Sequence, residues 1–112
     1  MNPIEQQRKV IDQVYHMVSG SCPQEATSAN CRFEYLRFDD GSASVEEQFN
    51  YVVKDKTIST FLDRRLSEDS MILIKELHSL MKAQTGGDWN AFTLTINEDG
   101  SVATKFEYPD KG

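Results

Sequence analysis

The side chains that most often carry catalysis in small proteins are few in this chain. Its histidines are His16 and His78, and its cysteines are Cys22 and Cys31. His16 follows Asp12 by four residues, a spacing that fits a surface pair on one helical turn as well as a base with its orienting carboxylate. We interpret this pair as a surface contact. A small hydrolase or isomerase that uses His16 or His78 with a carboxylate, in a pocket between helix and sheet, is an alternative.

The two cysteines do not form a motif for metal binding or thiol chemistry. Neither lies in a C-x-x-C pair or beside a histidine, arrangements typical of metal ligation and activated thiols. A disulfide between Cys22 and Cys31 would close a small loop, but a reducing cytosol favours two free thiols. No G-x-G-x-x-G, Walker-type or G-x-S-x-G motif occurs. We therefore expect no metal site, no cofactor and no catalytic residue, and hence a protein that is not an enzyme.

Carboxylates are the abundant charged groups, with 18 acidic against 12 basic residues and a net charge of −6. Most of them have an ordinary structural reason, because turns favour aspartate and helix starts favour acids. Glu46 and Glu107 differ, since each is expected on the polar side of a strand, where hydrogen-bonding groups can meet a flat partner. A merely solvated face is the alternative.

The acidic balance also restricts the kind of partner. It repels phosphate backbones, so direct binding of nucleic acid is disfavoured and a basic protein is favoured. The predicted contact surface combines polar positions on strands with acids in turns and near the C-terminus. Its candidate residues are Asp39, Asp40, Glu46, Gln48, Asn50, Glu98, Asp99, Glu107 and Asp110.

Length and hydropathy place the chain in a simple class. Its 112 residues suit one compact domain spanning residues 1–112. No apolar run approaches the roughly 20 residues that a membrane-spanning helix needs. The opening stretch, MNPIEQQRKV, lacks the apolar core of a secretion signal. A cytoplasmic protein without membrane contact is expected.

Two stretches have the apolar spacing of a helix. Asn2 can cap the first, with Pro3 suited to its first position, and Gly20 ends it. The second is expected to begin with Ser67 as its cap and to end at Gly86. Each presents one apolar face to a core. These faces consist of Ile4, Ile11, Val14, Tyr15 and Val18 in the first and Leu73, Ile74, Leu77, Leu80 and Met81 in the second.

Alternating apolar and polar residues predict strands at 31–38, 44–53, 58–62, 92–96 and 102–108. The first has apolar residues on both sides, so it is expected to be covered on both faces or bulged. Turn signals separate the strands, with Gly100 supplying the positive φ that a hairpin turn needs. The polar stretch from Ser21 to Asn30 is interpreted as a loop.

The order of these elements is α-β-β-β-α-β-β, which predicts an α+β fold. We expect an antiparallel sheet of about five strands with both helices packed on one face, because the cleanest strands have one polar side. Trp89, Phe92 and Tyr108 are expected in the core or at its edge. One shared core is predicted to contain Val45, Phe49, Tyr51, Leu77, Leu94, Ile96 and Phe106.

The C-terminal half resembles a known family. The run GGDWNAFTLTINEDGSVATKFEYPD follows the helical stretch SMILIKELHSLMKAQ and the strands FEYLRF and QFNYVV. This order of pieces, over roughly residues 31–110, resembles the YezG-like antitoxin and immunity proteins. The matching positions are Trp89, Asp99, Gly100, Phe106, Tyr108 and Asp110.

The resemblance implies an intracellular immunity protein that neutralises a cognate toxin. Such toxins are often nucleases, of which an RNase is favoured, delivered by contact-dependent growth inhibition or another polymorphic toxin system. A nuclease must present a basic cleft, which an acidic protein complements. We interpret the matching residues as determinants of the fold, because immunity surfaces differ between relatives. An acidic adaptor that binds another protein is the remaining alternative.

Overall fold

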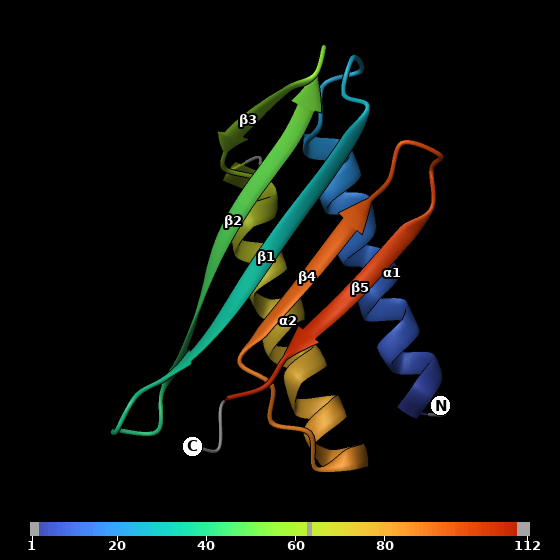
Figure 1. The fold of residues 1–112 in the computed structure, drawn as a ribbon. Coiled ribbons are helices and arrows are strands. Elements are labelled where there is room, and N and C mark those ends of the chain that lie inside the picture. Colours follow the sequence, from blue (N-terminus) through green and yellow to red (C-terminus); the bar gives the residue numbers. More distant parts are fainter. Residues whose placement is uncertain (1–2, 63, 110–112) are drawn as a thin grey trace.

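The computed structural model describes residues 3–62 and 64–109. An antiparallel sheet of five strands, in the order β3-β2-β1-β4-β5, lies in front of two helices (Figure 1). Both helices cover the same face of the sheet and leave the other face open. This confirms the predicted α+β fold and its order of elements. In chain order the elements are α1 (Pro3–Ser21), β1 (Ser28–Arg37), β2 (Ala43–Val53), β3 (Lys56–Thr60), α2 (Arg64–Thr85), β4 (Ala91–Ile96) and β5 (Val102–Glu107).

Helix α1 is held by a narrow apolar stripe. Val10, Val14 and Val18 recur every four residues and are buried against the sheet. Ile11 and Tyr15 pack beside them as predicted, whereas Ile4 is 57% exposed and lies outside the core. The predicted cap, Asn2, lies outside the described residues.

Helix α2 begins earlier than predicted. It starts at Arg64, so Ser67 is a helical residue and the prediction that it caps the helix is wrong. The Ser67 hydroxyl instead donates to Glu47 Oε1 on β2 at 3.1 Å. From the residue type alone, a serine that donates a hydrogen bond to a carboxylate on a distant strand cannot be told from a serine that caps a helix. The C-terminal end is as predicted, with Gly86 at φ 73° and its N–H bonded to the carbonyl of Lys82.

Strand β1 corrects two expectations. It begins at Ser28, inside the stretch interpreted as a loop, because residues 28–30 already pair with β2. Its register with both neighbours is unbroken, so it carries no bulge. It is covered on one side alone: Leu36 is only half-buried on the open face, and Phe38, just beyond the strand, is 52% exposed.

Strand β3 is displaced by two residues from the prediction. Lys54 and Asp55 take positive φ angles of 51° and 64° in a tight turn, which starts the strand at Lys56 and ends it at Thr60. The chain then leaves the sheet, and Leu62 is buried in the core. Strand β3 is therefore much shorter than its neighbour β2.

The core lies between the sheet and the helices. All seven residues predicted to share it belong to one cluster; Tyr51, Ile96 and Phe106 are only partly buried within it. Trp89 is 1% exposed and packs against Phe106 with ring centroids 5.4 Å apart. Tyr108 is 56% exposed, so its expected place in or beside the core is wrong.

Candidate functional site

All five strands contribute polar side chains to the open face of the sheet. Because side chains alternate along a strand, the register places Glu46, Glu34 and Glu107 in one row across β2, β1 and β5. Ala91 of β4 lies between Glu34 and Glu107, so only a methyl group occupies the row at that point. Three carboxylates thus share a line on a surface that no helix covers (Figure 1).

Arg32 holds part of this row together. Its Nε donates to Glu107 Oε2 at 2.9 Å and its Nη1 donates to Glu34 Oε2 at 3.2 Å. The hydrogen bond to Glu107 raises the pKa of Arg32, and the same bond lowers the pKa of Glu107. One guanidinium therefore bonds two carboxylates and stabilises the charged form of Glu107.

Glu46 is less compensated than its neighbours. It stands directly opposite Glu34 across the β1–β2 ladder, a position in which like charges repel. It takes part in no ion pair among residues 3–62 and 64–109. Its exposed carboxylate is therefore the one in the row that a basic partner can reach with the least competition from the protein itself.

A neutral ladder runs beside the acids. The Ser59 hydroxyl donates to Asn50 Oδ1 at 2.6 Å, and Asn50 Nδ2 donates to Asn30 Oδ1 at 3.1 Å. Gln48 lies between this ladder and the row of acids, opposite Arg32. The open face thus confirms the predicted outward direction of Glu46, Gln48, Asn50 and Glu107. Whether they contact a partner stays a prediction.

The predicted turn acids lie far from one another. Asp39 and Asp40 are in the β1–β2 turn, and Glu98 and Asp99 are in the β4–β5 turn at the opposite end of the sheet (Figure 1). Asp40 Oδ1 accepts bonds from the N–H and hydroxyl of the serine two residues later, and Asp99 does the same. These bonds lower the pKa of both carboxyls. Asp110 lies outside the described residues.

Two neighbours of the predicted residues were not singled out from the sequence. Arg32 and Glu34 alternate with Phe33 and Tyr35, so the period that buries the aromatics turns the charges outward. This alternation can be read from the sequence. The ion pair between Arg32 and Glu107 cannot, because it joins residues 75 positions apart.

The histidines occupy contrasting positions. His16 Nε2 is 3.5 Å from Asp12 Oδ2, with the two side chains 69% and 68% exposed, as expected for a surface pair. His78 is 2% exposed, and its Nε2 is 2.9 Å from Asp88 Oδ1. The ring of Tyr35 stacks on His78 at 3.9 Å between centroids. A histidine–carboxylate pair therefore exists, but its ring offers almost no surface to a substrate.

Electrostatics around this pair favour a neutral His78. Burial lowers the pKa of His78 and outweighs the opposite effect of Asp88. Partial burial alone would raise the pKa of Asp88, but the charges of Arg37 and Lys82, with His78, hold it below its ordinary value. Arg37 Nη2 lies 3.1 Å from Asp88 Oδ1. The contacts of Asp88 with His78, Lys82 and Arg37 therefore link α2 to the end of β1, which is a structural role.

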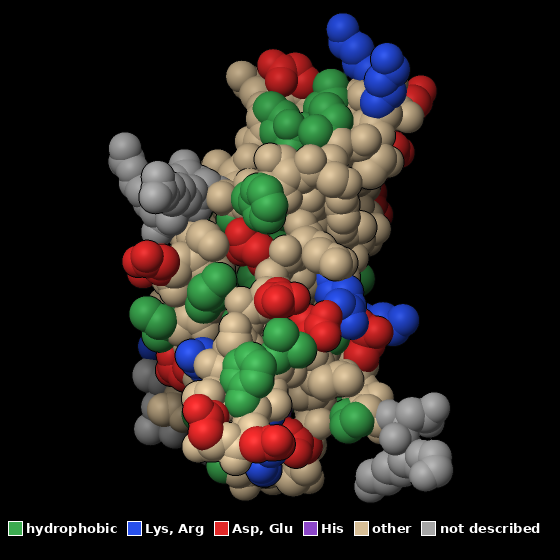
Figure 2. All heavy atoms as spheres, turned by 90° about the vertical axis from the view of Figure 1, so that its left-hand side faces the viewer, with side chains coloured by type: hydrophobic (Ala, Val, Ile, Leu, Met, Phe, Trp, Pro, Cys, Tyr) green, Lys and Arg blue, Asp and Glu red, His purple; other side chains and the backbone are tan. Residues whose placement is uncertain are grey.

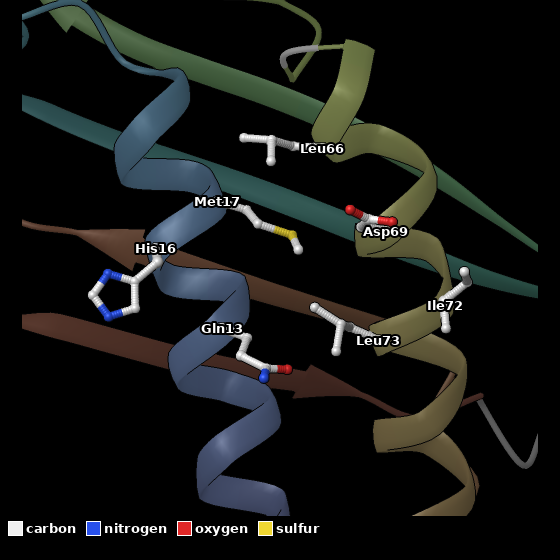
Figure 3. A pocket seen from close by; sticks show the side chains of 7 residues that line it. All are labelled: Gln13, His16, Met17, Leu66, Asp69, Ile72 and Leu73. Carbon is white, nitrogen blue, oxygen red and sulfur yellow. The ribbon is translucent and has the colours of Figure 1, made fainter.

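The helical side of the molecule has a shallow groove between α1 and α2, of about 520 Å³. In Figure 3, Met17 and Leu73 point into the space between the helices, while the ring of His16 points away from α2. Asp69 is the acidic residue of this lining. The groove therefore does not assemble His16 with a carboxylate across the two helices.

The described part of the chain contains no disulfide, no candidate metal site and no membrane-spanning helix. Cys22 and Cys31 are free thiols, as predicted, and burial raises the pKa of both. Residues 3–62 and 64–109 contain no group of three or more His, Cys, Asp or Glu side chains placed to hold a metal ion. None of the helices in this part of the chain is long and apolar enough to cross a membrane.

Comparison with known proteins gives one partial relative. No family model matches the chain. A protein from Stenotrophomonas maltophilia named "Chorionicgonadotropic hormone-like protein" is 31% identical over 78 residues, or 70% of this chain. The chain spans only 18% of the length of that relative. The similarity therefore concerns a small part of a longer protein.

Proposed function

We propose that this chain is an immunity protein that acts in the cytoplasm, binds a basic toxin and blocks it without catalysis of its own. The toxin class favoured is a nuclease, and among nucleases an RNase, of a contact-dependent growth inhibition or other polymorphic toxin system. The observation that carries the proposal is the uncovered sheet face, on which Glu34, Glu46 and Glu107 form one row.

Physical complementarity supports this choice of partner. An acidic surface on a chain of net charge −6 attracts the basic cleft that a nuclease needs for its phosphate substrate. The open face carries hydrogen-bonded polar side chains, from the Asn30–Asn50–Ser59 ladder to the Arg32–Glu107 pair, which suits contact with a protein better than enclosure of a small molecule. The resemblance to YezG-like immunity proteins points in the same direction.

The test is protection in living cells. Domains encoded by the genes that flank this one are expressed alone and together with the chain. One of them should arrest growth when expressed alone, and co-expression of the chain should restore growth. Glu46→Arg should abolish protection, since it reverses the least compensated charge of the row. The matched control is Glu76→Arg, the same reversal at an exposed position of α2, on the layer behind the sheet. Growth arrest that persists with the wild-type chain would contradict the proposal.

An enzyme is the second candidate, and the His78–Asp88 bond of 2.9 Å is the observation in its favour. Replacement of His78 by Ala separates the two functions. An immunity protein that still folds should keep its affinity for the toxin after this change, whereas a hydrolase or isomerase should lose activity. An acidic adaptor would pass the same mutational test but would give no protection against a toxin.

A further inference from the structure

Strand β2 has an edge that is only half paired. Strand β3 pairs with Phe49–Val53 alone, although β2 begins six residues earlier at Ala43. Residues 43–48 are therefore bonded to β1 on one side and to no described strand on the other. The lower half of β2 lies at the free margin of the sheet in Figure 1. An unpaired edge is a template for another extended chain.

The directions of the backbone groups follow from the register. The N–H of Tyr35 donates to the carbonyl of Asn90 at 2.8 Å, so odd-numbered residues of β1 turn their backbone groups toward β4. Even-numbered residues of β1 then bond to even-numbered residues of β2. In agreement, the carbonyl of Val52 accepts a bond from the residue just before β1. The N–H and C=O groups of Val45 and Glu47 consequently point to the open edge.

The side chain of Glu47 points away from solvent although it carries a charge. It lies on the helix side of the sheet, where Oε1 accepts the Ser67 hydroxyl at 3.1 Å. Its Oε2 atom is buried and has no hydrogen-bond partner. A buried carboxylate oxygen without a partner is costly, and its presence in a native protein calls for an explanation.

A cavity of about 410 Å³ lies directly at this edge. Its lining includes Glu46 and Glu47 on β2, Ser67 and Met71 on α2, and Phe61, which is 77% exposed. Figure 2 views the molecule from this side and shows hydrophobic side chains interspersed with acidic and basic ones over the face. Arg32 also lines the cavity, with its guanidinium bonded to Glu34 and Glu107. The cavity thus offers the carboxylates of Glu46 and Glu47 beside apolar surface, next to backbone groups that no described strand pairs.

We propose that the free edge of β2 at residues 43–48 binds an extended basic segment of a protein partner as an added strand. The backbone of the segment pairs with Val45 and Glu47, and one of its Lys or Arg side chains enters the cavity and donates to Glu47 Oε2. Phe61 and Met71 contact the aliphatic part of that side chain. The choice of a basic protein as the partner rests on the proposed function. The assignment of the free β2 edge as a binding site does not, because it follows from the geometry alone.

Charge selects this occupant over a second copy of the chain. Pairing of two β2 edges would bring Glu46 and Glu47 of both copies together, in molecules that each carry a net charge of −6. Like charges across a strand pair are destabilising. A segment with lysine or arginine meets the same carboxylates with attraction.

A designed peptide tests the edge without knowledge of the toxin. The probe is an acetylated, amidated peptide of about eight residues that alternates Lys and Val, because such a sequence is extended and basic on one side. It is titrated into the ¹⁵N-labelled full chain. The expected result is slowed hydrogen exchange at the amides of Val45 and Glu47, with unchanged exchange at the amide of Glu46, which already bonds toward β1. The same peptide N-methylated at alternate residues should not bind.

Two variants with the same change of net charge sharpen the test. Glu47→Gln keeps the shape and the bond from Ser67 but removes the charge, so it should weaken peptide binding about tenfold. Glu98→Gln removes one carboxylate from the distant β4–β5 turn and should leave binding unchanged. Equal weakening by both variants would show general charge attraction and overturn the proposal.

Three other results would also overturn it: no protection of the two edge amides at saturating peptide, protection confined to the open face, or dimerisation of Glu47→Gln without any peptide binding. In the last case the acids only guard the edge against self-association. These results leave the protection test of the proposed function untouched. Conversely, edge binding of the peptide by a chain that never protects cells would sustain this inference and refute immunity.

Discussion

The two faces of the sheet are built from the same strands yet obey different rules. On the helix-covered face, Phe33, Phe49 and Leu94 are 0–1% exposed and are held by burial of apolar area. On the open face, Arg32 and Glu107 keep 34% and 38% of their side chains exposed and are held by hydrogen bonds. The covered face therefore sets the fold, whereas the open face can change without unfolding the domain and is free to match a partner.

Truncation of a core side chain should give the largest effect. Leu77→Ala removes a side chain that is fully buried between α2 and the sheet and should lower the free energy of unfolding by about 2–5 kcal/mol. Phe106→Ala should fall at the lower end of this range, because Phe106 is only half-buried. Urea denaturation measures both, with Thr93→Ala on the open face as the control. Unchanged midpoints for Leu77→Ala and Phe106→Ala would show that the faces of the sheet are wrongly assigned.

The buried histidine predicts a pH dependence. Burial lowers the pKa of His78 in the folded state, so the unfolded chain binds a proton more readily. The contribution of His78 to stability should be fully present above the ordinary histidine pKa of about 6.5 and should decrease as the pH is lowered through and below that value. Denaturation midpoints across this range provide the measurement.

Two variants assign that pH dependence. His78→Phe keeps an aromatic ring beside Tyr35 and should flatten the pH profile, since the titrating group is gone. His16→Phe should retain the wild-type slope, because its side chain is 69% exposed. A slope that survives in His78→Phe would mean that another group, not His78, titrates with folding.

The directions of the strand side chains could be predicted from the sequence, because they depend on the alternation of apolar and polar residues. Alternation in the β4–β5 hairpin correctly assigned Phe92 and Leu94 to the core and Glu107 to the outside. The same rule applied to β2 puts Glu47 on the helix side with Val45 and Phe49, which is where its Oε1 accepts the Ser67 hydroxyl.

Long-range contacts could not be predicted in this way. The start of α2 was missed because Ser67 bonds to Glu47, 20 residues away, instead of capping its own helix. The free edge of β2 was missed because it depends on where β3 stops. Strand β3 ends at Thr60, and Leu62 just beyond it is buried in the core, a tertiary contact without a local signal. The candidate edge site therefore emerged only from the structure.

Arg32 offers a smaller effect on the open face itself. Arg32→Ala leaves Glu34 and Glu107 without their shared cation, in a row that also contains Glu46. Stability should fall by only a fraction of the loss for Leu77→Ala, because exposed ion pairs contribute little. The loss should shrink further at about 0.5 M salt, where screening weakens the repulsion among the carboxylates.

The comparison that checks this is urea denaturation at low and high salt, with Lys105→Ala as control. Lys105 is a cation of the same face that makes no ion pair among the described residues. A loss for Arg32→Ala that equals the loss for Lys105→Ala, or that does not respond to salt, would show that the bridge to Glu34 and Glu107 is incidental.

The turn acids should give the smallest effect of all. Asp39 and Asp40 lie at one end of the sheet, exposed to solvent, and Asp40 is already engaged with Ser42. Their reversal to Lys should slow association with the toxin less than Glu46→Lys does, because solvent screens charges at a turn tip more than charges inside an interface. Association rates against salt concentration rank the variants, since an electrostatically steered complex must lose rate as salt rises. If the wild-type rate ignores salt and every reversal is silent, the acidity serves solubility alone and apolar contacts hold the partner.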